Sequence, residues 1–275
     1  MKITGIFATP VLGPITILLT NFLLIFYHGF VFANIPYALG FSIIALTLFF
    51  RIVLYPFTAS QIRTSVKMQK IAPHVNKLKE LHKNDSKKLQ EETMKLYKEH
   101  GVNPAAGCLP MIIQLPFIWA LYALLQYVVK TAPTQVLTAV NNVVYFPFLK
   151  LPMVWDQHFF GLSLGQAPAD MFKHGMVWIL IFPALTAALQ FIQSKMMFNT
   201  PAPEPGAQKK DDLSSAMQTQ SLYIFPIMIG FFSYTLPFGL TLYWNTFTLF
   251  GILQQYLVAG WGGLESHIEK FLRRK

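Results

Sequence analysis

Long apolar runs alternate with short polar segments along this chain. Five runs are long enough to cross a membrane at about 20 residues per crossing. They cover residues 37–58, 106–129, 175–197, 219–236 and 240–259. Only Pro237, Phe238 and Gly239 separate the last two runs, which predicts a tight helical hairpin. The pattern therefore predicts an all-α membrane protein with five transmembrane helices.

A sixth apolar run, within the N-terminal region 1–36, carries its polar side chains on one side. These side chains gather on one arc when the run is drawn as a helix at about 100° per residue. They are Thr16, Thr20, Asn21, Tyr27 and His28. This pattern favours an amphipathic helix lying in the plane of the membrane interface. A sixth transmembrane helix and a signal peptide ending near Ala33 are the alternatives.

The basic residues are concentrated in one loop and in the C-terminal tail. Segment 59–103 holds ten lysines and arginines against five acidic residues, and the tail 260–275 adds four more. The loop 130–174 holds only three basic residues. Because basic residues stay on the cytoplasmic side, the N-terminus and loop 130–174 are expected outside and the C-terminus in the cytoplasm. Topology thus accounts for most of the net charge of +10, and no specific nucleic-acid partner is expected.

Segment 59–103 has the pattern of a charged helical hairpin. Apolar residues recur at helical spacing in each half, and Pro73 is expected to interrupt the first helix. Asp85 or Ser86 is placed to cap the second helix, and Gly101 to end it. The hairpin is either a solvated element held near acidic lipid headgroups or a docking element for a partner. A flexible cytoplasmic linker is expected over residues 198–218.

Arg51 is a charged residue inside the first predicted span. An arginine at the centre of a membrane helix costs about 3 kcal/mol. All twelve carboxylates of the chain lie outside the five spans, so water, backbone carbonyls or amides must hold the guanidinium. The candidate amides are Gln114, Gln190 and Asn245. Arg51 is then either an anchor that reaches toward the cytoplasmic surface or the charge of a hydrated cavity.

Motifs for catalysis, cofactors and metals are missing or misplaced. The sequence lacks H-E-x-x-H, a Walker loop and G-x-G-x-x-G, and its single cysteine, Cys108, excludes a cysteine-based zinc site. A G-x-S-x-G match at 161–165 sits in a predicted loop with no strand before it, which a nucleophile elbow requires. The chain is therefore expected to be no enzyme and to need no cofactor or metal.

Several segments resemble the YidC family of membrane protein insertases. They are FRIVLYP at 50–56, MKLYKEH at 94–100, GVNPAAGCLP at 101–110, QLPF at 114–117, FFSY at 231–234, GLTLYW at 239–244 and QQY at 254–256. The resemblance extends in order over residues 14–260 and implies a five-helix core around a hydrophilic groove. This groove is open to the cytoplasm and the lipid and closed outside.

The resemblance also implies partners and roles. The chain would insert and chaperone nascent membrane proteins at the cell membrane, alone or with the Sec translocon, and the cytoplasmic hairpin would capture substrates. Contacts with the ribosome and the signal recognition particle pathway would be weak or transient. Arg51 would meet hydrophilic or acidic parts of the substrate. The other groove residues would be Gln114, Gln190, Trp244 and Asn245. A small channel or transporter, and a scaffold in which Arg51 is purely structural, are the other functions considered.

Overall fold

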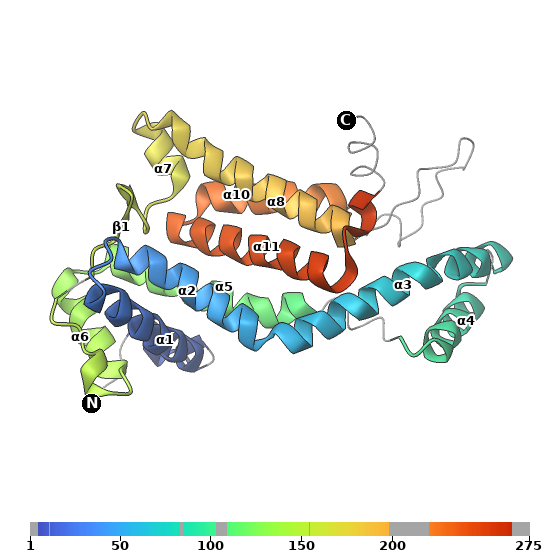
Figure 1. The fold of residues 1–275 in the computed structure, drawn as a ribbon, viewed down its shortest axis with the longest axis horizontal. Coiled ribbons are helices and arrows are strands. Elements are labelled where there is room, and N and C mark those ends of the chain that lie inside the picture. The colour runs from blue at the N-terminus through green and yellow to red at the C-terminus, as the bar shows by residue number, and fades with distance from the viewer. Residues whose placement is uncertain are drawn as a thin grey trace.

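The computed structural model describes residues 5–10, 12–82, 85–102, 109–153, 155–197 and 220–265. These residues form an almost wholly helical molecule, which confirms the predicted all-α character (Figure 1). The elements are η1 (Gly5–Ala8), α1 (Leu12–Phe32), α2 (Ala38–Val53), α3 (Tyr55–Leu81), α4 (Ser86–Glu99), α5 (Leu109–Lys130), α6 (Pro133–Val143), η3 (Pro147–Leu149), β1 (His158–Phe159), β2 (Leu162–Ser163), α7 (Pro168–Lys173), η4 (Val177–Leu180), α8 (Ile181–Met197), η5 (Gln220–Ile224), α10 (Phe225–Thr235), α11 (Phe238–Ala259) and η6 (Gly262–Leu264).

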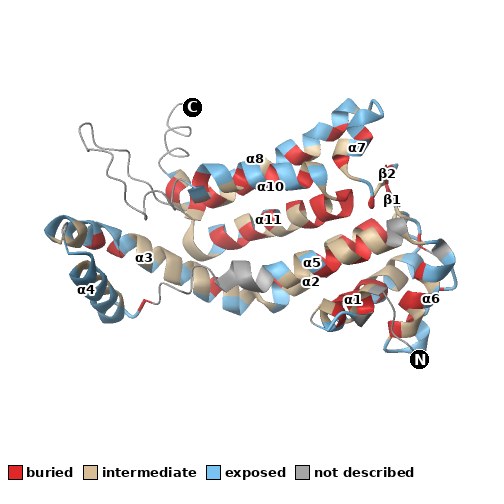
Figure 2. Ribbon diagram, turned by 180° about the vertical axis from the view of Figure 1, so that it is seen from behind, coloured by how far each residue is buried: buried red, intermediate tan, exposed pale blue. Residues whose placement is uncertain are grey.

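The helices form a bundle with one projecting arm. In Figure 1, α8, α10 and α11 lie on one side of the bundle and α1, α2 and α5 on the other, while α3 and α4 extend beyond it. Figure 2 shows the buried positions concentrated in the bundle, with few in the arm. The predicted linker 198–218 lies outside the described residues, and so does most of the predicted tail 260–275.

Several helices have the apolar composition of membrane-spanning segments. Leu12–Phe32 and Val177–Met197 are each long and apolar enough to cross a membrane alone. Helices α2 and α3 together form a third candidate with a 65° bend. Shorter apolar helices occupy Leu115–Tyr127 and Leu222–Thr235. The composition is that of a membrane protein, and the count of five transmembrane helices stays a prediction.

The first predicted span is broken before its expected end. The sequence pattern predicts one span over 37–58, whereas α2 ends at Val53 and α3 begins at Tyr55 with a new direction. Pro56 stands in the first turn of α3 and has no N–H to donate to the preceding turn. The break at Leu54 follows from this missing hydrogen bond, which an apolar pattern does not record.

The polar arc of α1 faces the protein. Thr16, Thr20 and Asn21 are buried, and both threonine hydroxyls donate to carbonyls one turn earlier. The exposed residues Leu18 and Phe32 are apolar instead. The polar arc thus packs against protein, and a helical pattern alone does not say which side of a helix does so. An interfacial position for α1 stays a prediction.

The predicted helical hairpin is present as α3 and α4, with one difference from the prediction. Helix α3 continues through Pro73, which lies on its exposed side, so the expected interruption is wrong. Asp85 caps α4 as predicted by accepting a hydrogen bond from the backbone N–H of Lys88, and Gly101 follows α4 with a φ of 61°. The two helices share a small apolar cluster. Its residues are Met68, Ile71, Val75, Leu96, Tyr97 and Val102.

At the predicted outer end of the bundle, the predicted outer loop packs against the α10–α11 turn. The backbone N–H groups of Phe238 and Gly239 donate to the carbonyls of Gln166 and Leu164 at 2.8 and 2.7 Å. Leu164 and Phe238 are almost completely buried. The two-residue strand β1 lies just before the G-x-S-x-G match, so the expectation of no strand before the match is wrong.

Candidate functional site

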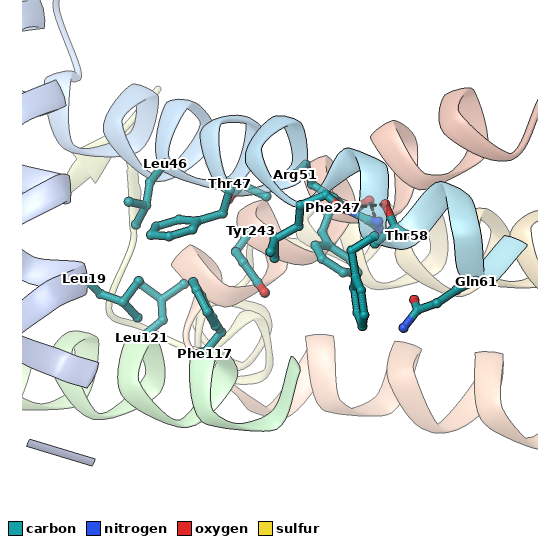
Figure 3. Close-up of a pocket in the computed structure, with 13 residues that line it drawn as sticks. Leu19, Leu46, Thr47, Arg51, Thr58, Gln61, Phe117, Leu121, Tyr243 and Phe247 are labelled. Atoms are coloured by element: carbon teal, nitrogen blue, oxygen red, sulfur yellow. Dashed lines mark hydrogen bonds between the residues drawn. The ribbon is translucent and has the colours of Figure 1, made fainter. Parts of the chain in front are cut away.

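A pocket opens inside the bundle where α1, α2, α3, α5 and α11 meet (Figure 3). Its empty space is about 730 Å³, part of it open to the surroundings. Most of its lining side chains are apolar. The lining residues are Leu19, Leu46, Thr47, Phe50, Arg51, Leu54, Phe57, Thr58, Gln61, Phe117, Leu121, Tyr243 and Phe247.

Arg51 supplies the charge of this pocket. It lies in the last turn of α2 and is only 8% exposed. Its Nη2 donates to the carbonyl oxygen of Phe247 at 2.7 Å, and its guanidinium carbon lies 3.4 Å from the centre of the Phe247 ring. Its Nη1 donates to Oε1 of Gln254 at 3.5 Å. A carbonyl, an amide and an aromatic face thus replace the water that a guanidinium normally binds.

The guanidinium has no acidic partner in the described part of the chain. No carboxylate there forms an ion pair with it, and its Nε is buried without a hydrogen-bond partner among the same residues. The prediction that backbone carbonyls or amides hold Arg51 is confirmed. Arg51 therefore keeps its net charge and one unused donor, which suits it to a polar or acidic group entering the pocket.

Gln254 is the amide that contacts Arg51, and the sequence prediction missed it. Its Nε2 donates to the carbonyl of Tyr55 at 3.3 Å and to the hydroxyl of Thr58. Gln254 therefore links the arginine on α2 to the first turn of α3 across the break at Leu54. Helical spacing could have identified Gln254, because Tyr243, Phe247 and Gln254 fall on one side of α11 at about 100° per residue.

Gly251 allows the guanidinium to lie close to α11. A Cβ built on Gly251 would stand 2.7 Å from Nη2 of Arg51 and 2.2 Å from the side-chain nitrogen of Gln193. Both distances are shorter than real Cβ contacts. The glycine thus makes room for two polar groups beside the helix backbone.

The other predicted groove residues lie elsewhere or outside the described part. Gln190 on α8 and Asn245 on α11 are buried, and Trp244 is half-buried, yet none of the three lines the pocket. Asn245 and Trp244 follow Tyr243 on α11 and are turned away from its side of the helix. The side chain of Gln114 lies outside the described residues. The structure thus brings Arg51 together with Tyr243, Phe247 and Gln254, and the roles of the other four stay predictions.

The fold and the pocket define a class of protein, a helical membrane protein with a cationic cavity. The model of the family described as 60Kd inner membrane protein matches residues 30–262. The membrane protein insertase YidC of Fusobacterium nucleatum is 32% identical over 80% of this chain and 85% of its own length. That of Oceanobacillus iheyensis is 31% identical over 92% of this chain and 84% of its own.

A chloroplast protein is also similar to this chain. The inner membrane ALBINO3-like protein 2 of Chlamydomonas reinhardtii is 33% identical over 90% of this chain and 57% of its own length. This chain belongs to the 60Kd inner membrane protein family, which includes the YidC insertases. The resemblance seen in the sequence motifs is confirmed. Members of this family are insertases and not enzymes, so the chain is no enzyme.

Proposed function

We propose that this chain helps other membrane proteins to enter and fold in the bilayer by receiving their hydrophilic segments at Arg51. The observation that carries this proposal is the guanidinium itself, buried in a partly open pocket without an acidic partner among the described residues. A charge kept at this depth is costly and is typical of functional sites.

The chemistry of the pocket suits a substrate with both polar and apolar parts. Arg51 and Gln61 offer hydrogen bonds to a polar or acidic segment, and the lining phenylalanines offer apolar contacts to the helix that follows. Placing the polar segment beside a fixed cation lowers the cost of moving it out of water. Transfer of the apolar segment into lipid then supplies the driving force.

The closed outer end favours entry from the other side. Packing around Leu164 and Phe238 blocks the outer end, while the hairpin of α3 and α4 projects from the opposite end. We therefore propose that the N-terminus is outside, the C-terminus is cytoplasmic, and the hairpin captures nascent chains. Cooperation with the Sec translocon, and weak contacts with ribosomes and the signal recognition particle pathway, belong to the same proposal.

Site-specific photo-crosslinking to a stalled nascent membrane protein tests the pocket directly. A photoreactive residue at Gln61 or Phe117, which line the pocket, is expected to crosslink to the substrate. The control is Leu249 on α11, which is exposed and lines no part of the pocket. Equal crosslinking from Leu249 and from the pocket positions would contradict the proposal. Probes at Gln114, Gln190, Trp244 and Asn245 rank these four candidates in the same assay.

Depletion of the protein tests the function as a whole. Insertion of a single-span substrate into the membrane is expected to fall, and solute flux across the membrane is expected to stay constant. Unchanged insertion with altered flux would favour a channel or transporter instead.

A further inference from the structure

A group of exposed aromatic side chains marks the predicted outer part of the molecule. Tyr145, Phe146 and Phe148 follow α6, and we call them the aromatic ledge. Each of the three is more than half exposed, and Phe148 is 70% exposed. The Phe146 and Phe148 rings stack with their centres 5.6 Å apart. Aromatic rings grouped in this way on a surface indicate a contact partner.

The backbone under the ledge is satisfied by side chains rather than left to water. Asn21 of α1 donates to the carbonyl of Val143 at 3.0 Å and accepts from the N–H of Tyr145 at 2.7 Å. His28 lies about two turns further along α1 and donates to the carbonyl of Leu149 at 3.1 Å. The ledge is thus fixed along α1 by two polar side chains.

A third side chain closes the far end of the segment. Asn141 donates to the carbonyl of Leu151 at 2.9 Å and accepts from its N–H at 2.8 Å. Two further bonds run within the segment, from Leu149 N–H to Phe146 and from Lys150 N–H to Pro147. A segment that protein or lipid shields from water must satisfy its backbone within the protein, so this segment is equipped to leave water.

The surroundings of the ledge match a lipid surface. The ledge runs beside α1, whose exposed residues Leu18, Ile25 and Phe32 are all apolar. Between Lys130 and Asp156 the only charged residue is Lys150, which is exposed. Stacked aromatics with a flanking lysine are the residue types found where protein meets phospholipid headgroups.

We infer that the aromatic ledge inserts into the outer interface of the bilayer beside α1. The buried Leu149 anchors the segment to the protein, while the neighbouring rings reach into the lipid. The ledge would hold α1 at a fixed depth. This inference goes beyond the proposed function, and it holds whether or not substrates bind at Arg51.

Quenching by brominated phospholipid tests the inference on the purified full chain. In a Cys108→Ser background, which removes the only native cysteine, Phe148→Cys carries an environment-sensitive fluorophore. The protein is placed in phosphatidylcholine vesicles with or without bromine on the upper acyl chain. The probe is expected to emit at shorter wavelength than in water and to lose most of its emission in the brominated vesicles. The control is His174→Cys, an exposed position in the same outer loop.

Two further variants keep the test decisive. Phe146→Cys gives an independent probe on the ledge if the Phe148 variant fails to fold. Asn141→Leu removes both side-chain bonds to Leu151 and is expected to reduce the quenching at Phe148. If bromine quenches the probes on the ledge no more than the probe at His174, the inference is overturned. The exposed rings would then be assigned to contact with a protein partner.

Discussion

Two halves of the bundle differ in their polar groups, the predicted outer half at the α10–α11 turn and the predicted inner half at Arg51. In the outer half, Thr186, Ser233 and Thr241 form a chain of hydroxyl contacts at 3.0 Å between α8, α10 and α11. In the inner half, Arg51 shares a pocket with apolar walls and keeps an unpaired Nε within the described region. The three hydroxyls therefore satisfy one another, although Gln126 Oε1 and Trp155 Nε1 in the same half are buried without partners among the described residues. The other half differs in holding a charged group beside a pocket.

Helix α11 shows the same difference along its own length. At its outer end Thr241 both donates and accepts, and Gly239 lets the helix meet the outer loop closely. Further inward, Asn245 and Thr248 have buried oxygens without partners among the described residues. One helix thus contributes both to the closure outside and to the polar interior. Substitutions at Gly239 and at Gln254 separate these two contributions.

Removing the cation is expected to have the largest effect. Arg51→Ala should lower insertion of a substrate with an acidic outer segment by about tenfold, equivalent to about 1.4 kcal/mol. Arg51→Lys should be intermediate, because an ammonium keeps the charge but lacks the planar fork. Protease protection of the substrate in vesicles measures insertion, and thermal unfolding confirms that each variant is folded. Normal insertion by a folded Arg51→Ala variant would contradict the role of the charge.

Crowding the outer end should destabilise the fold while leaving the arginine in place. A Cβ at Gly239 would stand 2.8 Å from a Leu125 methyl group and 3.2 Å from the Leu164 carbonyl oxygen. Gly239→Val is expected to cost about 2 kcal/mol of unfolding free energy, since overpacking a closed site typically costs 1–3. Denaturant titration measures this change. Gly29→Val is the matched control, because no described atom apart from its chain neighbours and its own helix backbone lies within 4 Å of a Cβ at that site. An equal cost at both positions would refute the explanation.

Gln254 can be used to separate the charge of Arg51 from its positioning. Gln254→Leu removes the bonds to Tyr55 and Thr58 and should cost about 1 kcal/mol. The angle between α2 and α3, followed by spin-label distances, is expected to spread. Gln254→Glu keeps an acceptor for Arg51 but neutralises the pocket, so insertion of acidic substrates should fall as in Arg51→Ala. If the Gln254→Glu variant inserts these substrates normally, the net charge of the pocket does not determine the insertion of acidic substrates.

Much of this arrangement could be predicted from the sequence, because it depends on local pattern. Apolar runs predicted the helices, Asp85 predicted the start of α4, and the absence of acids in the spans predicted carbonyl or amide partners for Arg51. The break at Leu54 and the continuity of α3 through Pro73 could not be predicted in this way. Both depend on backbone hydrogen bonds, about which a hydropathy pattern gives no information.

Contacts between distant segments were the other part that the sequence did not reveal. Asn21 lies on the polar arc of α1, and its partners are Val143 and Tyr145, more than 120 residues away. Gln254 is 203 residues from Arg51. A single sequence shows which residues share one side of a helix. It does not show which other helix that side will contact.

The hydroxyl chain of the outer half should be modest in energy and unrelated to insertion. Thr241→Val keeps the shape of the side chain but removes its bonds to Ser233, and should cost about 1 kcal/mol of unfolding free energy. Thr235→Val, at an exposed position of α10, is the control and should change stability by less than about 0.5 kcal/mol. Insertion assays on both variants should match the unmodified protein, and a loss with Thr241→Val alone would mean that the two halves are coupled.

The smallest expected effect is the pH response of the outer loop. The hydrogen bond from His158 Nδ1 to Asp156, 2.8 Å long, holds the pKa of that carboxyl below its ordinary 3.8. A lowered folded-state pKa means that the bond adds stability above pH 3.8 and that this stability is lost as the pH falls through the lowered value. His158→Ala should therefore unfold at a slightly lower temperature than the unmodified protein at neutral pH, and the difference should vanish on acidification. Both groups are exposed, so the difference is small. A difference that persists in strong acid would show that His158 stabilises the loop by packing instead of through Asp156.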